Sequence, residues 1–149
     1  YLWGLYIFCN RKWEKVISNC IKGDTGVDEL DNVSVILDNG VMANMNISSC
    51  SMLNMHAVVS CEHGRIEIDN LHDTQIASIK NPRATDYEIQ CEKLVNGFEY
   101  ELIACRDALR NKQMEITDMP HAEILEVMRI MDKLRKEWGV VYPENVENI

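Results

Sequence analysis

The chain has 149 residues, of which 46% are hydrophobic and 26% are charged, a composition typical of one globular domain with its own core. Twenty-four Asp and Glu against fifteen Lys and Arg give a net charge of −9, which repels phosphate backbones and anionic lipid head groups. These values exclude a disordered or collagen-like chain, and they argue against nucleic acid and membranes as partners.

The N-terminal stretch, Tyr1 to Cys9, is the longest apolar run of the sequence. It is half as long as the roughly 18 residues that a membrane span requires, and no basic segment precedes it. We therefore expect neither an anchor nor a signal peptide, and we expect a cytoplasmic protein. The helical spacing of Leu2, Leu5 and Cys9 predicts that residues 1–12 are the tail of a connecting helix.

The cysteines contain no C-x-x-C pair, and several fall within strand-like or helical apolar patterns. Free cysteine in such places behaves as a small hydrophobic residue, so we expect reduced thiols in the core. A metal site using Cys61, His63 and His72 is a weaker alternative, because structural zinc usually takes four ligands. The six cysteines are Cys9, Cys20, Cys50, Cys61, Cys91 and Cys105.

Alternating apolar residues predict a series of strands joined by short turns. One strand is expected over residues 15–22, and a hairpin over 33–47 turns at Asn39-Gly40, a dipeptide that supplies positive φ. A second hairpin is expected over 57–69, with strands at 74–80 and 86–94 after it. Strands in this arrangement make an open, mainly antiparallel sheet with one face to bury.

Two helices are expected in the C-terminal third, packed on one face of the sheet. The first carries an apolar stripe of Phe98, Leu102, Cys105 and Leu109, and we expect it to end at Asn111 in the left-handed region. For the second we expect Asp118 as the N-cap, Pro120 in the first turn and Gly139 as the stop. The fold class is therefore α+β.

No motif of the sequence by itself identifies an enzyme. Gly23 and Gly26 lie between predicted strands, not in the G-x-G-x-x-G pattern at a helix start that binds a dinucleotide. P-loop, H-E-x-x-H and G-x-S-x-G motifs are also missing from the sequence. Among the histidines, His63 and His72 fall in expected loops and His121 in a helix start, whereas His56 precedes a strand and is a candidate to face a cleft.

An ordered set of short segments resembles the C-terminal domain of the glucose-fructose oxidoreductase, inositol dehydrogenase and MocA family. The resemblance covers most of the chain from about residue 16 onward, and its order is more specific than any single piece. The segments are GVDE at 26–29, DNG at 38–40, EHGRIEI at 62–68, GFEYE at 97–101, MPHAE at 119–123, MRIMD at 128–132 and GVVYPE at 139–144.

This resemblance implies an NAD(P)-dependent oxidoreductase acting on a sugar, polyol or dihydrodiol-like secondary alcohol, with residues 1–149 as its substrate-binding and oligomerisation domain. NAD or NADP would be bound by an N-terminal Rossmann domain that this chain lacks, so the chain alone is expected to be inactive and to bind no cofactor. In the family, the helix before this domain carries an Asp-x-x-x-His or Asp-x-x-x-Tyr element, and Tyr1 falls at or just beyond its end. Tyr1 is thus the candidate catalytic residue, and Tyr1 and His56 are the candidate substrate-binding residues.

Two readings of the function compete at this point. The first is the oxidoreductase domain, which is expected to form a dimer or tetramer through its exposed sheet face. The second is a standalone, non-catalytic domain that self-associates through the same face, as uncovered apolar sheet faces tend to do. A G-x-G-x-x-G motif in a βαβ pattern upstream in the coding sequence would favour the first.

Overall fold

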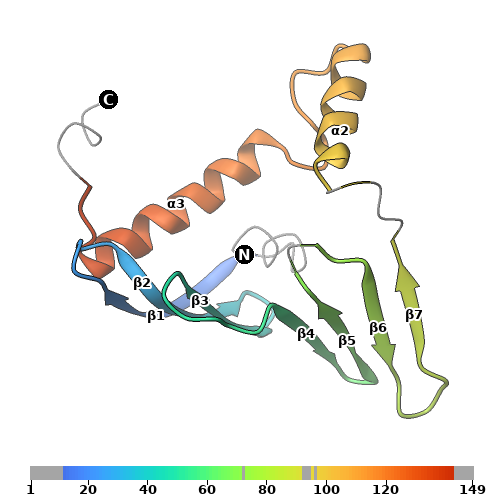
Figure 1. The fold of residues 1–149 in the computed structure, drawn as a ribbon, viewed down its shortest axis with the longest axis horizontal. Helices are drawn as coiled ribbons and strands as arrows, with labels where there is room; N and C mark the ends of the chain where they lie inside the picture. The colour runs from blue at the N-terminus through green and yellow to red at the C-terminus, as the bar shows by residue number, and fades with distance from the viewer. Residues whose placement is uncertain (1–11, 72, 92–94, 96, 143–149) are drawn as a thin grey trace. The chain divides into compact units, whose positions relative to one another are not determined.

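A computed structural model describes residues 12–71, 73–91, 95 and 97–142 of the chain (Figure 1). It divides the chain into two compact units. Of the described residues, the first unit contains those up to Leu53 and from Thr117 onward, and the second contains those within Asn54–Ile116. The predicted connecting-helix tail at residues 1–12 lies outside the described residues except for Lys12, so it stays a prediction.

The first unit is built on a three-stranded antiparallel sheet of β1 (Trp13–Lys22), β2 (Asp28–Leu37) and β3 (Met42–Ser48), in that order. The predicted hairpin is confirmed, because Gly40 has φ 81° and the Leu37 N–H donates to the Val41 carbonyl over 2.9 Å. A positive φ is accessible to glycine at little cost, which is why the Asn39-Gly40 pair forms this turn.

The core of the first unit follows from the period of two along β2. Val33, Val35 and Leu37 are each 1% exposed and pack with Leu134, which is 3% exposed and comes from the helix α3 (His121–Trp138). At the end of this helix the Trp138 indole Nε1 donates to Ser18 Oγ on β1 over 2.9 Å. Apolar packing and this bond fix α3 to the sheet.

The cap predicted for the C-terminal end of α3 is correct, but the cap predicted for its N-terminal end is not. Gly139 is the C-cap with φ 64°, which confirms the predicted stop. The predicted N-cap at Asp118 is wrong: Pro120, in extended conformation, is the residue directly before the helix, and no side chain caps it. Its carbonyl accepts bonds from the Glu123 and Ile124 N–H groups, so the helix starts two residues later than a capping aspartate would require.

The second unit contains a four-stranded antiparallel sheet in the order of the sequence. Its strands are β4 (His56–Cys61), β5 (Gly64–Asp69), β6 (Ile76–Lys80) and β7 (Tyr87–Gln90). Gly64 lies against the backbone carbonyl of Lys80, where a Cβ atom would collide with it. The expected strands are therefore present, and they are antiparallel as predicted, but they form two sheets and not one continuous sheet.

The helix α2 (Phe98–Arg110) belongs to the second unit. Phe98, Leu102 and Leu109 of its apolar stripe were expected to pack on the sheet, but they are 66%, 69% and 77% exposed, and Ala108 is the buried residue of the helix. Asn111 is the C-cap of α2, as predicted, but its expected left-handed conformation is wrong, because Asn111 has φ −84° and the positive φ of 55° falls one residue later, at Lys112.

Burial of the cysteines differs from the expectation. All five described cysteines are free thiols, but only Cys20 is partly buried, whereas Cys50, Cys61, Cys91 and Cys105 are exposed. Each of the four lies near a strand end, in a loop or on the outer side of α2, where the apolar pattern of its neighbours does not lead to burial. Cys9 lies outside the described residues.

None of the described helices is both long enough and apolar enough to cross a membrane.

Candidate functional site

Of the residues singled out from the sequence, His56 is the one that the structure places in a defined polar arrangement. It is the first residue of β4, at the strand edge where the sequence predicted it. Tyr1 and His72 lie outside the described residues, so the roles suggested for them stay predictions. His56 therefore anchors the candidate site, which lies entirely within the second unit.

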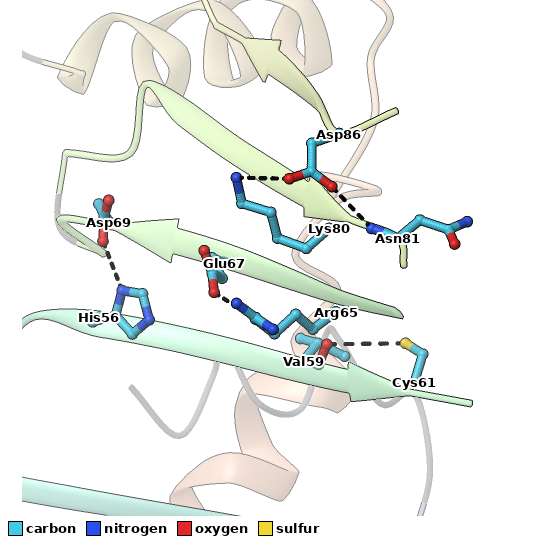
Figure 2. Close-up of polar contacts among 9 residues, drawn as sticks. All are labelled: His56, Val59, Cys61, Arg65, Glu67, Asp69, Lys80, Asn81 and Asp86. Carbon is cyan, nitrogen blue, oxygen red and sulfur yellow. Dashed lines mark hydrogen bonds and ion pairs between the residues drawn. The ribbon is translucent and has the colours of Figure 1, made fainter. Parts of the chain in front are cut away.

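His56 pairs with Asp69, the last residue of β5, directly across the two strands. The His56 Nδ1 atom lies 2.6 Å from Asp69 Oδ1, and Figure 2 shows the two side chains pointing toward one another. The His56 side chain is 29% exposed and that of Asp69 is 88% exposed. Residues that face each other in an antiparallel ladder point to the same side of the sheet, which brings the two groups together.

This geometry indicates which ring nitrogen of a neutral His56 carries the hydrogen. When His56 is neutral, an Nδ1–H that donates to the Asp69 carboxylate leaves the Nε2 lone pair free to accept. A carboxylate that orients an imidazole in this way is the arrangement that lets histidine accept a hydrogen bond, or a proton, from a hydroxyl group. The pair can therefore hold an alcohol oxygen at Nε2.

The same face of the sheet carries two further ion pairs (Figure 2). Arg65 Nε lies 2.5 Å from Glu67 Oε1 along β5, and Lys80 Nζ lies 3.3 Å from Asp86 Oδ2. The Asn81 N–H donates to the other Asp86 oxygen over 3.2 Å. That backbone bond first, and then Lys80, hold the pKa of the Asp86 carboxyl below its ordinary value.

The other described histidines do not join this site. His63 lies in the turn between β4 and β5 with a 66% exposed side chain, 4.0 Å from Glu62, and His121 is the first residue of α3, as predicted. Among the described residues, no group of three His, Cys, Asp or Glu side chains is arranged to hold a metal ion. The alternative with Cys61, His63 and His72 stays untested, because His72 lies outside the described residues.

The first unit contains a buried acidic residue that the sequence reasoning did not single out. Asp31 on β2 is 5% exposed and lies opposite Cys20 of β1. Burial, followed by the neighbouring carboxylates of Asp31 and Asp28, raises the pKa of the Cys20 thiol to about 11, and burial likewise raises the pKa of Asp31. The signal was present, because position 31 shares the inward phase of Val33 and Val35.

The described residues do not fit a dinucleotide cofactor. All strand pairings within them are antiparallel, and Gly23 and Gly26 form the turn between β1 and β2, where no helix begins. A pyrophosphate needs the N–H groups of a glycine-rich turn that leads into a helix. No step of cofactor chemistry is therefore assigned to these residues.

Comparisons with known proteins identify the fold. No family model matches the chain, and no curated protein matches it. Among solved structures, UDP-N-acetylglucosamine 3-dehydrogenase GnnA from Acidithiobacillus ferrooxidans matches with a TM-score of 0.75 and 13% identity, over 90% of this chain and 43% of that one. An aldose-aldose oxidoreductase from Caulobacter crescentus matches with a TM-score of 0.74 and 15% identity, over 91% of this chain and 42% of that one.

These values define the class of structure to which the chain is similar. The α+β fold of the chain occurs within oxidoreductases whose names refer to sugars and sugar nucleotides. At these identities the likeness shows the fold alone. The chain spans about two fifths of the length of each of these structures, and the rest of their length has no counterpart in it.

Proposed function

We propose that the chain is the substrate-binding and oligomerisation domain of an NAD(P)-dependent oxidoreductase of the glucose-fructose oxidoreductase, inositol dehydrogenase and MocA family. Its substrate would be a sugar, a polyol or a dihydrodiol-like secondary alcohol, and NAD or NADP would be bound by a separate Rossmann domain. The observation that carries the proposal is the match of 90% of this chain to 43% of a sugar-nucleotide dehydrogenase. The short segments that resemble the family, which follow one another along this chain in the family's order, also support it.

In this proposal His56 binds a substrate hydroxyl. Its Nδ1 is held by Asp69, so Nε2 is the atom that accepts the hydroxyl hydrogen. Tyr1, which the family resemblance places at the end of the acid-base element, would contact the substrate from the connecting helix. A cytoplasmic location accords with the five free thiols of the described residues, since the cytosol keeps thiols reduced.

We propose further that the protein forms a dimer or tetramer through the outer face of the β1–β2–β3 sheet, the face opposite Val33 and Val35. Beyond Lys15, which lies at one end, the side chains of this face are uncharged. They are Ile17, Asn19 and Ile21 on β1, Leu30, Asn32, Ser34 and Ile36 on β2, and Met42, Asn44, Asn46 and Ser48 on β3.

The polar groups of this face suit a second copy of the chain. Asn32 Nδ2 donates to Asn46 Oδ1 over 2.9 Å, and Ser34 Oγ donates to Asn44 Oδ1 over 2.7 Å. Amide groups both donate and accept, so a face rich in them is complementary to its own copy. Two chains that each carry −9 repel one another over most of their surface, and an uncharged face minimises this repulsion.

The enzymatic proposal is tested by cofactor binding and by turnover. The 149-residue chain, titrated with NADH and followed by fluorescence, is expected to show no saturable binding; tight binding would contradict a separate cofactor domain. The complete gene product is expected to reduce NAD or NADP in the presence of a sugar or polyol from a panel, measured by absorbance. A complete gene product that binds no dinucleotide and turns over none of the panel would overturn the proposal in favour of the non-catalytic reading.

The role of His56 is tested in the same assay with a matched pair of variants. His56→Gln is expected to lower kcat/KM about threefold to tenfold, mainly through KM, because it removes one oriented hydrogen bond to the substrate. His63→Gln changes an exposed histidine in the adjacent turn and is expected to leave both constants unchanged. Equal effects of the two variants would remove His56 from the substrate site.

Self-association is tested by light scattering coupled to gel filtration. The protein is expected to elute as a dimer or tetramer, and Ile17→Lys is expected to give monomers because it buries a charge in each contact. The matched control is Ile76→Lys on β6 in the second unit, since Ile17 is 50% and Ile76 is 42% exposed. A monomeric wild type, or an Ile17→Lys variant of unchanged mass, would refute this interface.

A further inference from the structure

A cavity of about 460 Å³ lies within the first unit, between α3 and the strands β2 and β3. Its volume falls within the range of about 300–1,000 Å³ that is usual for small-molecule sites. One side of its lining is apolar and includes two thioethers, and the other side carries charged groups. The apolar lining consists of Val33, Ile47, Val127, Met128, Met131, Leu134 and Trp138, and Asp28, Asp31, Asp132, Arg135 and Tyr142 complete it.

Asp31 is the unusual member of this lining. The residue is 5% exposed, and its Oδ1 atom has no hydrogen-bond partner among the described residues. The carboxyl group has side-chain hydrogen-bond partners in Cys20 and Asp28, but its Oδ1 atom loses its hydration without a compensating donor, which is costly to the folded state. Buried polar atoms of native proteins nearly always have a partner, so an orphan acceptor beside a cavity points to a ligand that supplies the donor.

The charge of the cavity selects the class of ligand. Among the described lining residues, three aspartates stand against one arginine. Arg135 is engaged at the rim, where its guanidinium carbon lies 4.7 Å from the centre of the Tyr142 ring and Nη2 lies 3.9 Å from Asp132 Oδ1. The excess of negative charge favours a cation over an anion or a neutral donor.

The apolar side selects the body of that ligand. Met128 and Met131 are 47% and 45% exposed on α3, and thioether side chains adapt their shape to different apolar partners. Trp138 adds an aromatic surface whose own N–H is already bonded to Ser18. A purely inorganic cation would leave this surface unused, and no metal-binding group of three ligands exists among the described residues.

We propose that this cavity binds a small organic amine, with its ammonium group hydrogen-bonded to Asp31 and its aliphatic or aromatic body against Met128 and Met131. The site lies in the first unit and is separate from the His56–Asp69 pair of the second unit. It does not depend on the proposed oxidoreductase activity. No bond is made or broken at it, so its function is binding alone.

The probe for this proposal is 2-phenylethylamine, and its neutral counterpart of nearly equal size is 2-phenylethanol. Calorimetric titration of the purified protein at neutral pH is expected to show saturable binding of the amine with a dissociation constant below about 1 mM, reasonable for a ligand of nine heavy atoms. The alcohol is expected to bind at least about tenfold more weakly, because a charge-assisted hydrogen bond is roughly twice as strong as a neutral one.

Three variants assign the binding to this cavity. Asp31→Asn keeps the shape of the side chain and removes its charge, and it is expected to weaken amine binding at least about tenfold with little change for the alcohol. Met131→Trp fills the apolar side and is expected to weaken both ligands. The matched control is Asp38→Asn, in the exposed turn between β2 and β3, which is expected to change neither.

The outcomes separate clearly. Amine binding that is lost in Asp31→Asn and kept in Asp38→Asn supports the proposal, and a circular dichroism spectrum identical to that of the wild type shows that the variant is folded. Equal affinity for amine and alcohol, equal effects of the two aspartate variants, or no saturable binding of the amine overturns it. Met131→Trp changes the apolar side of the cavity without changing the carboxylate. Amine affinity that is unchanged in this variant would place the binding outside the cavity and overturn the proposal.

Discussion

Leu134→Ala is the substitution that most directly tests how α3 is held on the sheet of the first unit. Leu134 is 3% exposed and packs against Val33, Val35 and Leu37, each of which is 1% exposed. Truncation of a buried leucine to alanine costs about 2–5 kcal/mol, depending on how far the surroundings relax.

The surroundings of Leu134 place the cost near the lower end of this range. Leu134 lines both the cavity of about 460 Å³ near Asp31 and a second cavity of about 580 Å³ on the Trp13 side of α3. The space left by the lost atoms opens onto these hollows, so side chains and water can relax into it. We therefore expect the free energy of unfolding to fall by about 2.5 kcal/mol.

Urea denaturation followed by tryptophan fluorescence measures this change. Both described tryptophans, Trp13 and Trp138, belong to the first unit, so their emission reports on that unit. The control is Leu125→Ala on the same helix, which is 56% exposed and is expected to cost about 0.5 kcal/mol or less. Equal costs for the two substitutions would refute the packing of α3 through Leu134.

Three further predictions concern single residues of the first unit. Gly139→Ala is expected to lower the free energy of unfolding by about 1 kcal/mol in the same urea assay, because Gly139 has φ 64° and alanine avoids that region; an unchanged midpoint would contradict it. Cys20, whose pKa is raised to about 11, is expected to react with iodoacetamide near pH 8 far more slowly than exposed Cys105, as followed by mass spectrometry, and equal rates would count against its burial. Asp31→Asn is expected to raise the free energy of unfolding at neutral pH, and this gain is expected to shrink as the pH falls to the ordinary carboxyl range.

The sign of the Asp31 prediction follows from the raised pKa of its carboxyl group. Burial favours the protonated form in the folded state, so the contribution of Asp31 to stability is full below the pKa of the unfolded chain and is lost as the pH rises through the higher folded value. Asparagine carries no charge at any pH and escapes that loss. A difference between variant and wild type that stays constant over this pH range would show that Asp31 ionises normally.

The local part of the fold was predictable because it depends on neighbours in the sequence. The alternation of Val33, Val35 and Leu37 defines one face of β2, and Asn39-Gly40 closes the hairpin that pairs β2 with β3. Gly139 ends α3 in the left-handed region for an equally local reason. Each of these features needs only the steric preferences of a few consecutive residues.

The features that were missed depend on residues far apart in the sequence or on the exact backbone path. The apolar stripe of α2 has helical spacing, but spacing does not tell which side of a helix meets a partner, and Ala108 is the side that this helix buries. Asp118 has the right side chain for an N-cap, yet the extended Pro120 follows it and shifts the start of α3. The break between β3 and β4 that yields two sheets also has no marker in the alternation of their residues.

Of the two residues of the candidate site, only His56 was predictable, because its pairing with Asp69 depends on residues far apart in the sequence. The sequence placed His56 at a strand edge but did not identify Asp69 as its partner, because that pairing depends on the register of β4 with β5. Asp69 lies thirteen residues away, and a shift of register by one would turn its side chain to the other face. Pairing of the right strands was therefore predictable from the hairpin, but the oriented imidazole was not.

At position 31, the residue that would best stabilise the fold differs from the residue that would bind a ligand. An alternating strand that continues its inward phase from Val33 to position 31 would be most stable with an apolar residue there, and the sequence has an acid. If the acid served only the fold, Asp31→Asn would cost stability; the burial of its carboxyl predicts instead that the variant gains stability and loses the amine. Stability and binding that move in opposite directions in one variant are the expected sign of a residue kept for its ligand, and a variant that gained both, or lost both, would remove that argument.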